Sequence, residues 1–275
     1  MPALEEKKRK LIAYLEELES VAVAFSGGVD STFLLKIAHD VLGDQALAVT
    51  AHSHSFPKRE LNEAIAFCKN EGIHHVLMEF EELKVEGFAD NPPNRCYLCK
   101  TALMTHLREV AHAQGAKHVV EGSNLDDLGD YRPGLRAIDE QQIKSPLRQA
   151  QLTKAEIRLL SKELGLATWY KPSFACLASR IPYGDEITEE RLRMIDRAEQ
   201  LLLELGLKQV RVRLHGTLAR IETDSEGMKL LMKTGNRESV YMELKSYGFS
   251  YVSLDLQGYR TGSMNESLVI HHKRI

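Results

Sequence analysis

The fold is decided by one stretch of the chain, Val21-Ala22-Val23-Ala24-Phe25-Ser26-Gly27-Gly28-Val29-Asp30-Ser31-Thr32. Its first five residues are all apolar, as in a short buried strand, and this run ends at a Ser-Gly-Gly sequence. The two glycines permit a tight turn and leave backbone N–H groups bare, and the following residues begin a helix whose positive end attracts phosphate oxygens. The stretch therefore predicts a strand, an anion-binding loop and a helix.

A strand-and-helix pattern continues on both sides of this stretch. Before it, leucines and isoleucine recur near helical spacing over residues 4–18. After it, we expect helices at 31–41, 61–69 and 101–113, and strands at 47–51, 75–80 and 118–122. Each step is about the length of a βα unit, which favours an α/β domain with a parallel sheet and helices on both faces. Ligands of such sheets bind beyond the carboxyl ends of the strands.

The second half of the chain predicts a smaller α+β domain. A helix-start signal at Thr153, with Glu156 three residues later, is followed by a long loop over 169–184. Beyond the loop we expect helices and strands in mixed order, at 187–205, 210–214, 218–223, 225–233, 240–247 and 251–256. We therefore expect a nucleotide-binding domain at 1–180 and a domain for substrate binding or oligomerisation at 181–275.

Composition narrows the class of protein. With 275 residues and 43% hydrophobic content, the chain can bury a sizeable core. Its 36 Lys and Arg residues against 39 Asp and Glu give a formal charge of -3, and no long run of either sign favours nucleic acid as a partner. The N-terminus is too charged for a signal peptide, and no apolar run approaches the roughly 20 residues that span a bilayer. We expect a cytoplasmic protein without a membrane partner.

The glycine loop lacks the Gly-Lys-Ser/Thr ending of the common NTPase loop, which serves transfer of the γ-phosphate. It resembles instead the PP-loop, SGGxDS/T, of the ATP pyrophosphatases, which have an adenine nucleotide alpha hydrolase-like fold. The resemblance implies ATP with Mg²⁺ as ligand, cleavage between the α- and β-phosphates, and Asp30 as a catalytic residue. The loop residues expected to bind ATP are Ser26, Gly27, Gly28, Asp30, Ser31 and Thr32.

A second polar segment, over 121–134, follows the last predicted strand of the first domain. The carboxyl ends of parallel strands meet at one edge of the sheet, so its carboxylates should lie beside the glycine loop, where they would hold Mg²⁺ against the triphosphate. The alternative is a solvated acidic turn. The residues that we expect to join the ATP site are Gly122, Asp127, Asp130 and Arg132.

Three of the four cysteines form a candidate metal centre. Cys96 and Cys99 make a C-x-x-C sequence on a loop entering a helix, and Cys176 follows in the long loop. Three thiolates can ligate three irons of a [4Fe–4S] cluster and leave the fourth iron open to an extra ligand such as sulfide. Zinc is the alternative metal, although no second C-x-x-C completes a zinc site. A redox dithiol is a further reading, and Cys68 lies in an apolar helix segment typical of a core.

Six stretches, the glycine loop among them, resemble the LarE family, ATP-dependent sulfur transferases that build the nickel-pincer nucleotide cofactor of lactate racemase. They cover nearly the whole chain and read AFSGGVDST (24–32), DYRPGL (130–135), CLASRIPYG (176–184), VRVRLH (210–215), ARIE (219–222) and LDLQGYRTGSMN (254–265). The resemblance implies adenylation of pyridinium-3,5-biscarboxylic acid mononucleotide and replacement of AMP by sulfur. The sulfur comes either from Cys176, sacrificed as dehydroalanine, or from a sulfide donor through the cluster held by all three cysteines. It also implies a homo-oligomer.

The substrate's phosphate has candidate ligands in the second domain. Arg211 and Arg213 alternate with valines, so both guanidinium groups should lie on one face of a strand, where paired hydrogen bonds could grip a phosphate. Ser179 and Arg180, beside Cys176, would complete that pocket. The resemblance further suggests two divalent-ion ligands, Glu199 and Glu222.

Three other functions compete with sulfur transfer. An ammonia-using PP-loop synthetase needs no cysteine trio, and the chain has no candidate glutaminase domain. A tRNA thiolase would favour additional paired cysteines and a basic RNA-binding surface. A nucleotide-binding sensor would hold ATP without cleaving it.

Overall fold

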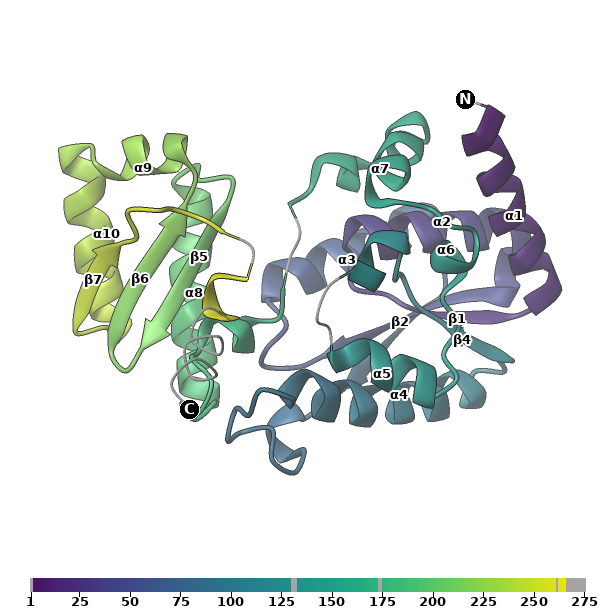
Figure 1. Ribbon diagram of the computed structural model, residues 1–275, viewed down its shortest axis with the longest axis horizontal. Coiled ribbons are helices and arrows are strands. Elements are labelled where there is room, and N and C mark those ends of the chain that lie inside the picture. The colour runs from purple at the N-terminus through teal and green to yellow at the C-terminus, as the bar shows by residue number, and fades with distance from the viewer. Residues whose placement is uncertain (1, 130–132, 173–174, 261, 266–275) are drawn as a thin grey trace. The chain divides into compact units, whose positions relative to one another are not determined.

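The computed structural model describes residues 2–129, 133–172, 175–260 and 262–265 (Figure 1). The chain divides into two compact units, the first made of residues 1–86 and 94–174 and the second of residues 87–93 and 175–275. The second unit thus begins before residue 181 and includes a short earlier segment. Asn91 attaches this segment, because its Nδ2 donates to the carbonyl oxygens of Pro182 and Asp185 at 2.6 and 3.0 Å.

The first unit is built on a parallel sheet with the strand order β3-β2-β1-β4. Val21 pairs with Ala46 on one side and with His118 on the other. The strands are β1 (Val21–Ala24), β2 (Ala46–His52), β3 (His75–Glu79) and β4 (His118–Val120). The larger helices of this unit are α1 (Pro2–Leu18), α2 (Val29–Leu42), α3 (Lys58–Glu71), α4 (Arg95–Ala113), α5 (Pro133–Glu140), α6 (Pro146–Gln149) and α7 (Lys154–Glu163).

Helices cover both faces of this sheet, as the sequence predicted. Side chains alternate along a strand, so Ala46 and Ala48 of β2 pack in one core and Leu47 and Val49 in another. The first core is closed by α1, α2, α3, α6 and α7, and the second by α4 and α5 (Figure 1). The sheet is therefore a buried α/β layer, and its ligands have to approach at a strand end.

The strand order identifies that end. The chain runs from β1 outward to β2 and β3, and then crosses to the other side of β1 to form β4. The loops after β1 and β4 consequently leave neighbouring strands in opposite directions. In open parallel sheets this switch point is where ligands bind, at the carboxyl ends of the strands.

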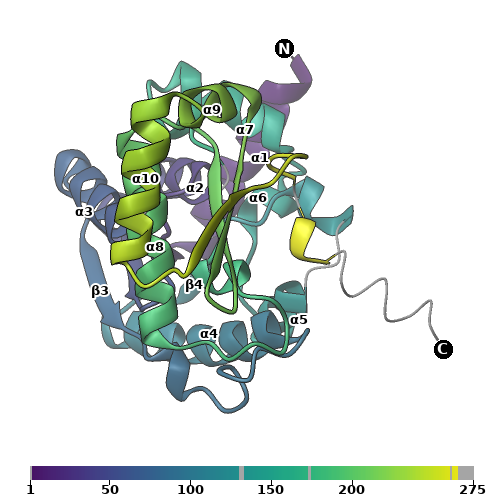
Figure 2. The same cartoon turned by 90° about the vertical axis from the view of Figure 1, so that its left-hand side faces the viewer.

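The second unit is a small α+β fold. β5 (Val210–His215) pairs antiparallel with β6 (Leu218–Thr223), and β6 pairs parallel with β7 (Tyr251–Leu254). The helices of this unit are α8 (Glu189–Glu204), α9 (Ser225–Leu231) and α10 (Thr234–Ser246). Helices α8 and α10 contact each other and run side by side (Figure 2).

Within the part of the chain that the structure describes, no helix combines the length and apolar character needed to cross a membrane.

Candidate functional site

The glycine loop joins β1 to α2 at the switch point. Gly28 is the N-cap residue of α2, and Gly27 has φ +65°, a conformation that side chains disfavour. The Ser31 hydroxyl donates to the Gly28 carbonyl oxygen at 3.3 Å and lies 3.1 Å from the Ser26 hydroxyl. The N-cap glycine provides no side-chain hydrogen bond. The first amides of α2, which begins at Val29, are thus available to an anion, and the binding of phosphate there stays a prediction.

The loop after β4 packs against the start of α2. A Cβ atom on Gly122 would lie only 3.0 Å from the backbone nitrogen of Ser31, so glycine favours this close approach. The segment then turns around Asn124, whose backbone N–H donates to Asp127 Oδ2 at 3.0 Å. Gly122 and Asp127 therefore lie beside the glycine loop, as expected. The predicted ATP ligands Asp130 and Arg132 lie outside the described residues.

Asp30 is mostly buried at this junction, and Lys154 is its ion-pair partner. Burial raises the pKa of the Asp30 carboxyl, and the Lys154 ammonium opposes this rise, while the charge of Asp127 adds to it. Oδ1 of Asp30 is buried and accepts no hydrogen bond within the described residues. Sequence reasoning missed Lys154. The capping box of Thr153 and Glu156 predicted where α7 begins. It did not indicate that Lys154, the first residue of that helix, contacts Asp30.

These groups fit ATP with Mg²⁺. A buried carboxylate oxygen without a partner and a second carboxylate nearby are the oxygen ligands that Mg²⁺ prefers, usually together with substrate phosphates. The uncapped amides of α2 supply the anion-binding half of such a site. Thr32, also predicted as an ATP ligand, is buried, and its hydroxyl has no hydrogen-bond partner among the described residues.

The cysteines divide between the two units. Cys96 and Cys99 are the second and fifth residues of α4, because that helix begins at Arg95, six residues before the predicted start at 101. The prediction that they lie on a loop before a helix was therefore wrong. Asn94 explains the earlier start, because its carbonyl oxygen accepts the Tyr97 and Leu98 amides. Cys176 belongs to the second unit. Cys68 is fully buried in the core, as predicted, and burial raises the pKa of its thiol to about 12.

The three candidate cluster ligands have the chemistry that iron requires. Cys96 and Cys176 are exposed, Cys99 is half-buried, and none of the three forms a disulfide within the described residues. The i, i+3 spacing places Cys96 and Cys99 on one face of α4. Among the described residues, no three His, Cys, Asp or Glu side chains are grouped closely enough to hold a metal ion.

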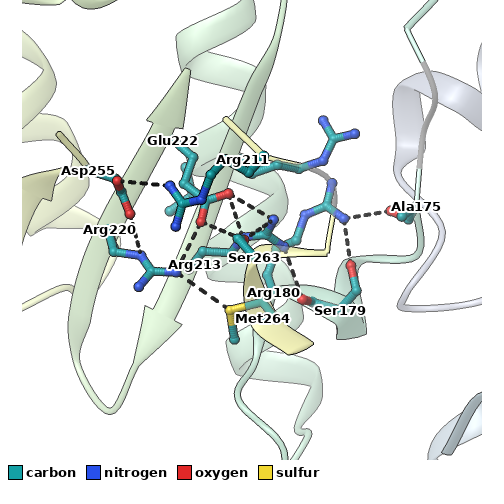
Figure 3. A network of polar contacts seen from close by, with 12 residues as sticks. Ala175, Ser179, Arg180, Arg211, Arg213, Arg220, Glu222, Asp255, Ser263 and Met264 are labelled. Carbon is teal, nitrogen blue, oxygen red and sulfur yellow. Dashed lines mark hydrogen bonds and ion pairs between the residues drawn. The ribbon is translucent and has the colours of Figure 1, made fainter. Parts of the chain in front are cut away.

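The predicted phosphate ligands meet in one network of the second unit (Figure 3). Arg180 donates from Nη1 to Ser179 Oγ at 2.8 Å and to the carbonyl oxygens of Ala175 and Cys176 at 2.8 and 3.3 Å. Arg213 donates to the Ser179 carbonyl oxygen at 3.1 Å. Arg180 and Ser179 therefore connect the backbone of the Cys176 segment to strand β5.

Arg211 and Arg213 share one face of β5, as their alternation predicted, and both are buried. The Arg211 guanidinium lies over the Tyr259 ring at 5.2 Å, and burial and the charge of Arg180 lower its pKa to about 10. Among the described residues, five arginines of the network face three carboxylates, since Arg220 and Arg260 pair with Asp255. This described part of the network thus has surplus positive charge, which favours an anion.

Glu199 and Glu222 are fully buried beside these arginines. Both oxygens of Glu199 accept from Arg180, and burial alone would raise its pKa, but Arg180 and Arg211 hold the pKa below its usual value. Glu222 Oε2 accepts two hydrogen bonds from Arg213, at 2.8 and 3.0 Å, and Oε1 accepts one from Arg220 (Figure 3). In the structure both carboxylates therefore neutralise arginines, and their role as divalent-ion ligands stays a prediction.

A parallel sheet with a Ser-Gly-Gly-x-Asp-Ser loop at its switch point defines the first unit as a PP-loop nucleotide-binding domain. In agreement, residues 4–123 match the family model described as NAD synthase. The chain is 44% identical to an uncharacterised protein of Synechocystis sp., over 96% of this chain and 99% of the relative. It is 30% identical to an uncharacterised protein of Methanocaldococcus jannaschii, over 88% and 92%.

A third relative has a named activity and matches nearly the whole chain. The pyridinium-3,5-bisthiocarboxylic acid mononucleotide synthase of Lactiplantibacillus plantarum is 38% identical, over 98% of this chain and 97% of the relative. The similarity thus includes both units and not the nucleotide-binding domain alone. The chain belongs to this family of enzymes, the LarE family of PP-loop sulfur transferases.

Proposed function

We propose that this chain adenylates the carboxylates of pyridinium-3,5-biscarboxylic acid mononucleotide, converts them to thiocarboxylates, and releases AMP and pyrophosphate. The observation that carries the proposal is the uncapped start of α2 beside the buried carboxylate of Asp30, at the switch point of the sheet. Bare amides and a carboxylate suit a triphosphate with its Mg²⁺. The name of the L. plantarum relative gives the product, pyridinium-3,5-bisthiocarboxylic acid mononucleotide, and the biscarboxylic acid is the compound with oxygen in place of that sulfur.

Adenylation makes a poor electrophile reactive. A carboxylate oxygen of the substrate attacks the α-phosphorus of ATP, the bond between the α- and β-phosphates breaks, and pyrophosphate leaves. The amides at the start of α2 stabilise the charge of the departing pyrophosphate. Asp30 and Asp127 would hold Mg²⁺, which would offset the phosphate charge. The acyl carbon then carries AMP as a leaving group, which a sulfur nucleophile can replace.

The arginine network of the second unit binds the phosphate of the mononucleotide. Its surplus positive charge supports this assignment, as does the fixed geometry that Glu199 and Glu222 impose on Arg180 and Arg213. Guanidinium groups suit phosphate because they present parallel N–H donors. The contact of Arg180 with the Cys176 carbonyl oxygen sets that cysteine next to the phosphate site within the same unit.

The sulfur reaches the acyl adenylate by one of two routes. In the route that we favour, Cys96, Cys99 and Cys176 would hold a [4Fe–4S] cluster, and this cluster would supply the sulfide that replaces AMP. In the other, the Cys176 thiolate attacks the acyl carbon and AMP leaves. Loss of the Cys176 α-proton then breaks its Cβ–S bond and leaves dehydroalanine and the thiocarboxylate. The presence of Cys96, which is exposed, and Cys99, which is half-buried, supports the first route, because the second does not require them.

The test is product analysis with ATP, Mg²⁺ and the biscarboxylate mononucleotide under anaerobic conditions. We expect substrate-dependent AMP and pyrophosphate. Asp30→Asn should reduce AMP formation about 100-fold, the effect typical of losing one transition-state contact. Asp40→Asn is the matched control on the same helix, since Asp40 pairs with Lys36 at the surface. ADP as the main product would contradict adenylation, and ATP binding without turnover would favour the sensor.

A further inference from the structure

Lys171 contacts the backbone of the glycine loop from outside the strand-and-helix unit that forms it. Its Nζ donates to the Gly27 carbonyl oxygen at 3.2 Å. The same ammonium forms ion pairs with Glu60 and Glu63 of α3, at 2.7 and 2.5 Å. The side chain is only 16% exposed, so these contacts are made in a largely desolvated position.

The backbone of this lysine is also fixed. Arg158 of α7 donates from Nη1 to the Trp169 carbonyl oxygen at 2.6 Å and from Nη2 to the Lys171 carbonyl oxygen at 2.8 Å. Both ends of the Lys171 side chain are therefore held, the backbone by α7 and the ammonium by α3. The Gly27 carbonyl is bound by a group with little freedom to move.

This hydrogen bond fixes the orientation of one peptide plane. The bond between Gly27 and Gly28 is trans, so its carbonyl and its N–H point in opposite directions. With the carbonyl held by Lys171, the Gly28 N–H faces away from the lysine. A peptide between two glycines can rotate easily, because neither neighbour has a Cβ atom to restrict it. An anchor on the carbonyl is what keeps the N–H in one direction.

The burial of Glu60 is explained by the same arrangement. A buried carboxylate costs free energy unless it is paired, and apolar replacements often stabilise as well or better. Glu60 is 5% exposed, and its backbone oxygen lies 3.5 Å from the position that a Cβ on Gly27 would occupy. This turn of α3 thus lies directly against the loop. A carboxylate there holds the ammonium at the Gly27 carbonyl, which an apolar residue could not do.

We propose that Lys171 is a positioning residue that locks the Gly27–Gly28 peptide, so that the Gly28 N–H is preset to bind the pyrophosphate portion of ATP. The proposal rests on the proposed function of the loop as an ATP site. Lys171 acts through the backbone, and Glu60 and Glu63 act through Lys171. The lysine adds no direct contact to the nucleotide.

Binding of inorganic pyrophosphate and of adenosine, measured separately by calorimetry and by ligand NMR, tests this role. Lys171→Met should weaken pyrophosphate binding roughly tenfold and leave adenosine binding unchanged. Lys171→Arg should restore pyrophosphate binding. The matched control is Lys162→Met, because Lys162 lies over the ring of Trp169 in the same region without contacting the loop.

Glu60→Gln separates positioning from simple charge attraction. If Lys171 only attracted phosphate, removal of a nearby negative charge would tighten pyrophosphate binding. Positioning predicts weaker binding, because the ammonium loses its anchor. If Glu60→Gln does not fold, Glu63→Gln gives the same contrast at a more exposed position. Tighter binding in either variant, or unchanged binding in Lys171→Met, would overturn the proposal. A wild-type protein that binds neither ATP nor pyrophosphate would instead refute the proposed function.

Discussion

Arg180 and Glu199 form a two-bond ion pair, Nε to Oε1 at 2.8 Å and Nη2 to Oε2 at 3.0 Å, with both side chains fully buried. Glu199 Oε1 also accepts the backbone N–H of Val212, at 3.0 Å. One carboxylate thereby connects the Cys176 segment, helix α8 and strand β5. The pair shapes the proposed phosphate site and stabilises the unit that contains it.

Removal of Glu199 should therefore destabilise the protein strongly. Glu199→Ala leaves the Arg180 charge buried beside Arg211, and breaking such a pair costs about 3 kcal/mol or more. The free energy of unfolding, measured by urea denaturation, should fall by that amount. Glu204→Ala, on the exposed side of the same helix, is the control and should change it by less than about 1 kcal/mol. A small effect at position 199 would mean that the pair does not hold the unit together.

Loss of Arg211 should weaken binding of the mononucleotide substrate but not binding of ATP. Arg211→Ala removes a cation from the surplus-positive network, so the mononucleotide substrate should bind roughly tenfold more weakly or worse. ATP binding should not change, because the glycine loop belongs to the other unit. Equilibrium titration of each ligand checks this, with the exposed Arg193→Ala on α8 as control. Equal weakening of both ligands would contradict the assignment of Arg211 to the substrate.

Lys154 should set the pH dependence of AMP formation. Burial raises the pKa of Asp30, and the Lys154 ammonium opposes that rise. Lys154→Met removes the opposition, so the pKa rises further and a higher pH is needed to ionise Asp30. The acid limb of the rate profile should therefore move to higher pH.

The matched control for Lys154 is Lys7→Met. Lys7 also pairs with a residue in the first turn of α7, Glu156, at 2.8 Å. Its removal should leave the acid limb in place, because the groups that act on the pKa of Asp30 are Lys154, Asp127 and Asn124. An unchanged limb in Lys154→Met would show that Asp30 does not limit the rate in acid.

The features of the fold that short-range sequence patterns determine could be predicted from the sequence. The apolar run of β1, the glycines after it and the βα alternation are short-range signals, and they predicted the parallel sheet and the glycine loop after β1. They did not predict the strand order, which sets the switch point. The alternation in β5 likewise placed Arg211 and Arg213 on one face. It did not predict their burial, which depends on partners across the fold, including Ser263 for Arg213.

Residues that act over long sequence separations were missed. Lys154 lies 124 positions from Asp30, and Lys171 lies 144 positions from Gly27. Near each lysine the sequence has only ordinary helix and turn signals. A lysine at a helix start or after a short turn is usually solvated, so neither residue was expected to contact the glycine loop. Only the folded chain brings these ammonium groups to the glycine loop.

The source of the sulfur can be determined from the intact mass of the protein after turnover. If Cys96, Cys99 and Cys176 hold a cluster, added sulfide supports several turnovers per chain and leaves the polypeptide mass unchanged. Anaerobically purified protein should then contain about four irons per chain, the number in a [4Fe–4S] cluster, and Cys96→Ala should lose both iron and repeated turnover. Cys68→Ala is the matched control, since Cys68 is a buried core thiol whose replacement affects packing alone. Sacrifice of Cys176 gives the opposite result: at most one sulfur per chain, loss of the mass of H₂S as position 176 becomes dehydroalanine, and no effect of Cys96→Ala. Intact mass measured after turnover with ATP, substrate and sulfide distinguishes these outcomes, because only the sacrificial route removes sulfur from the chain.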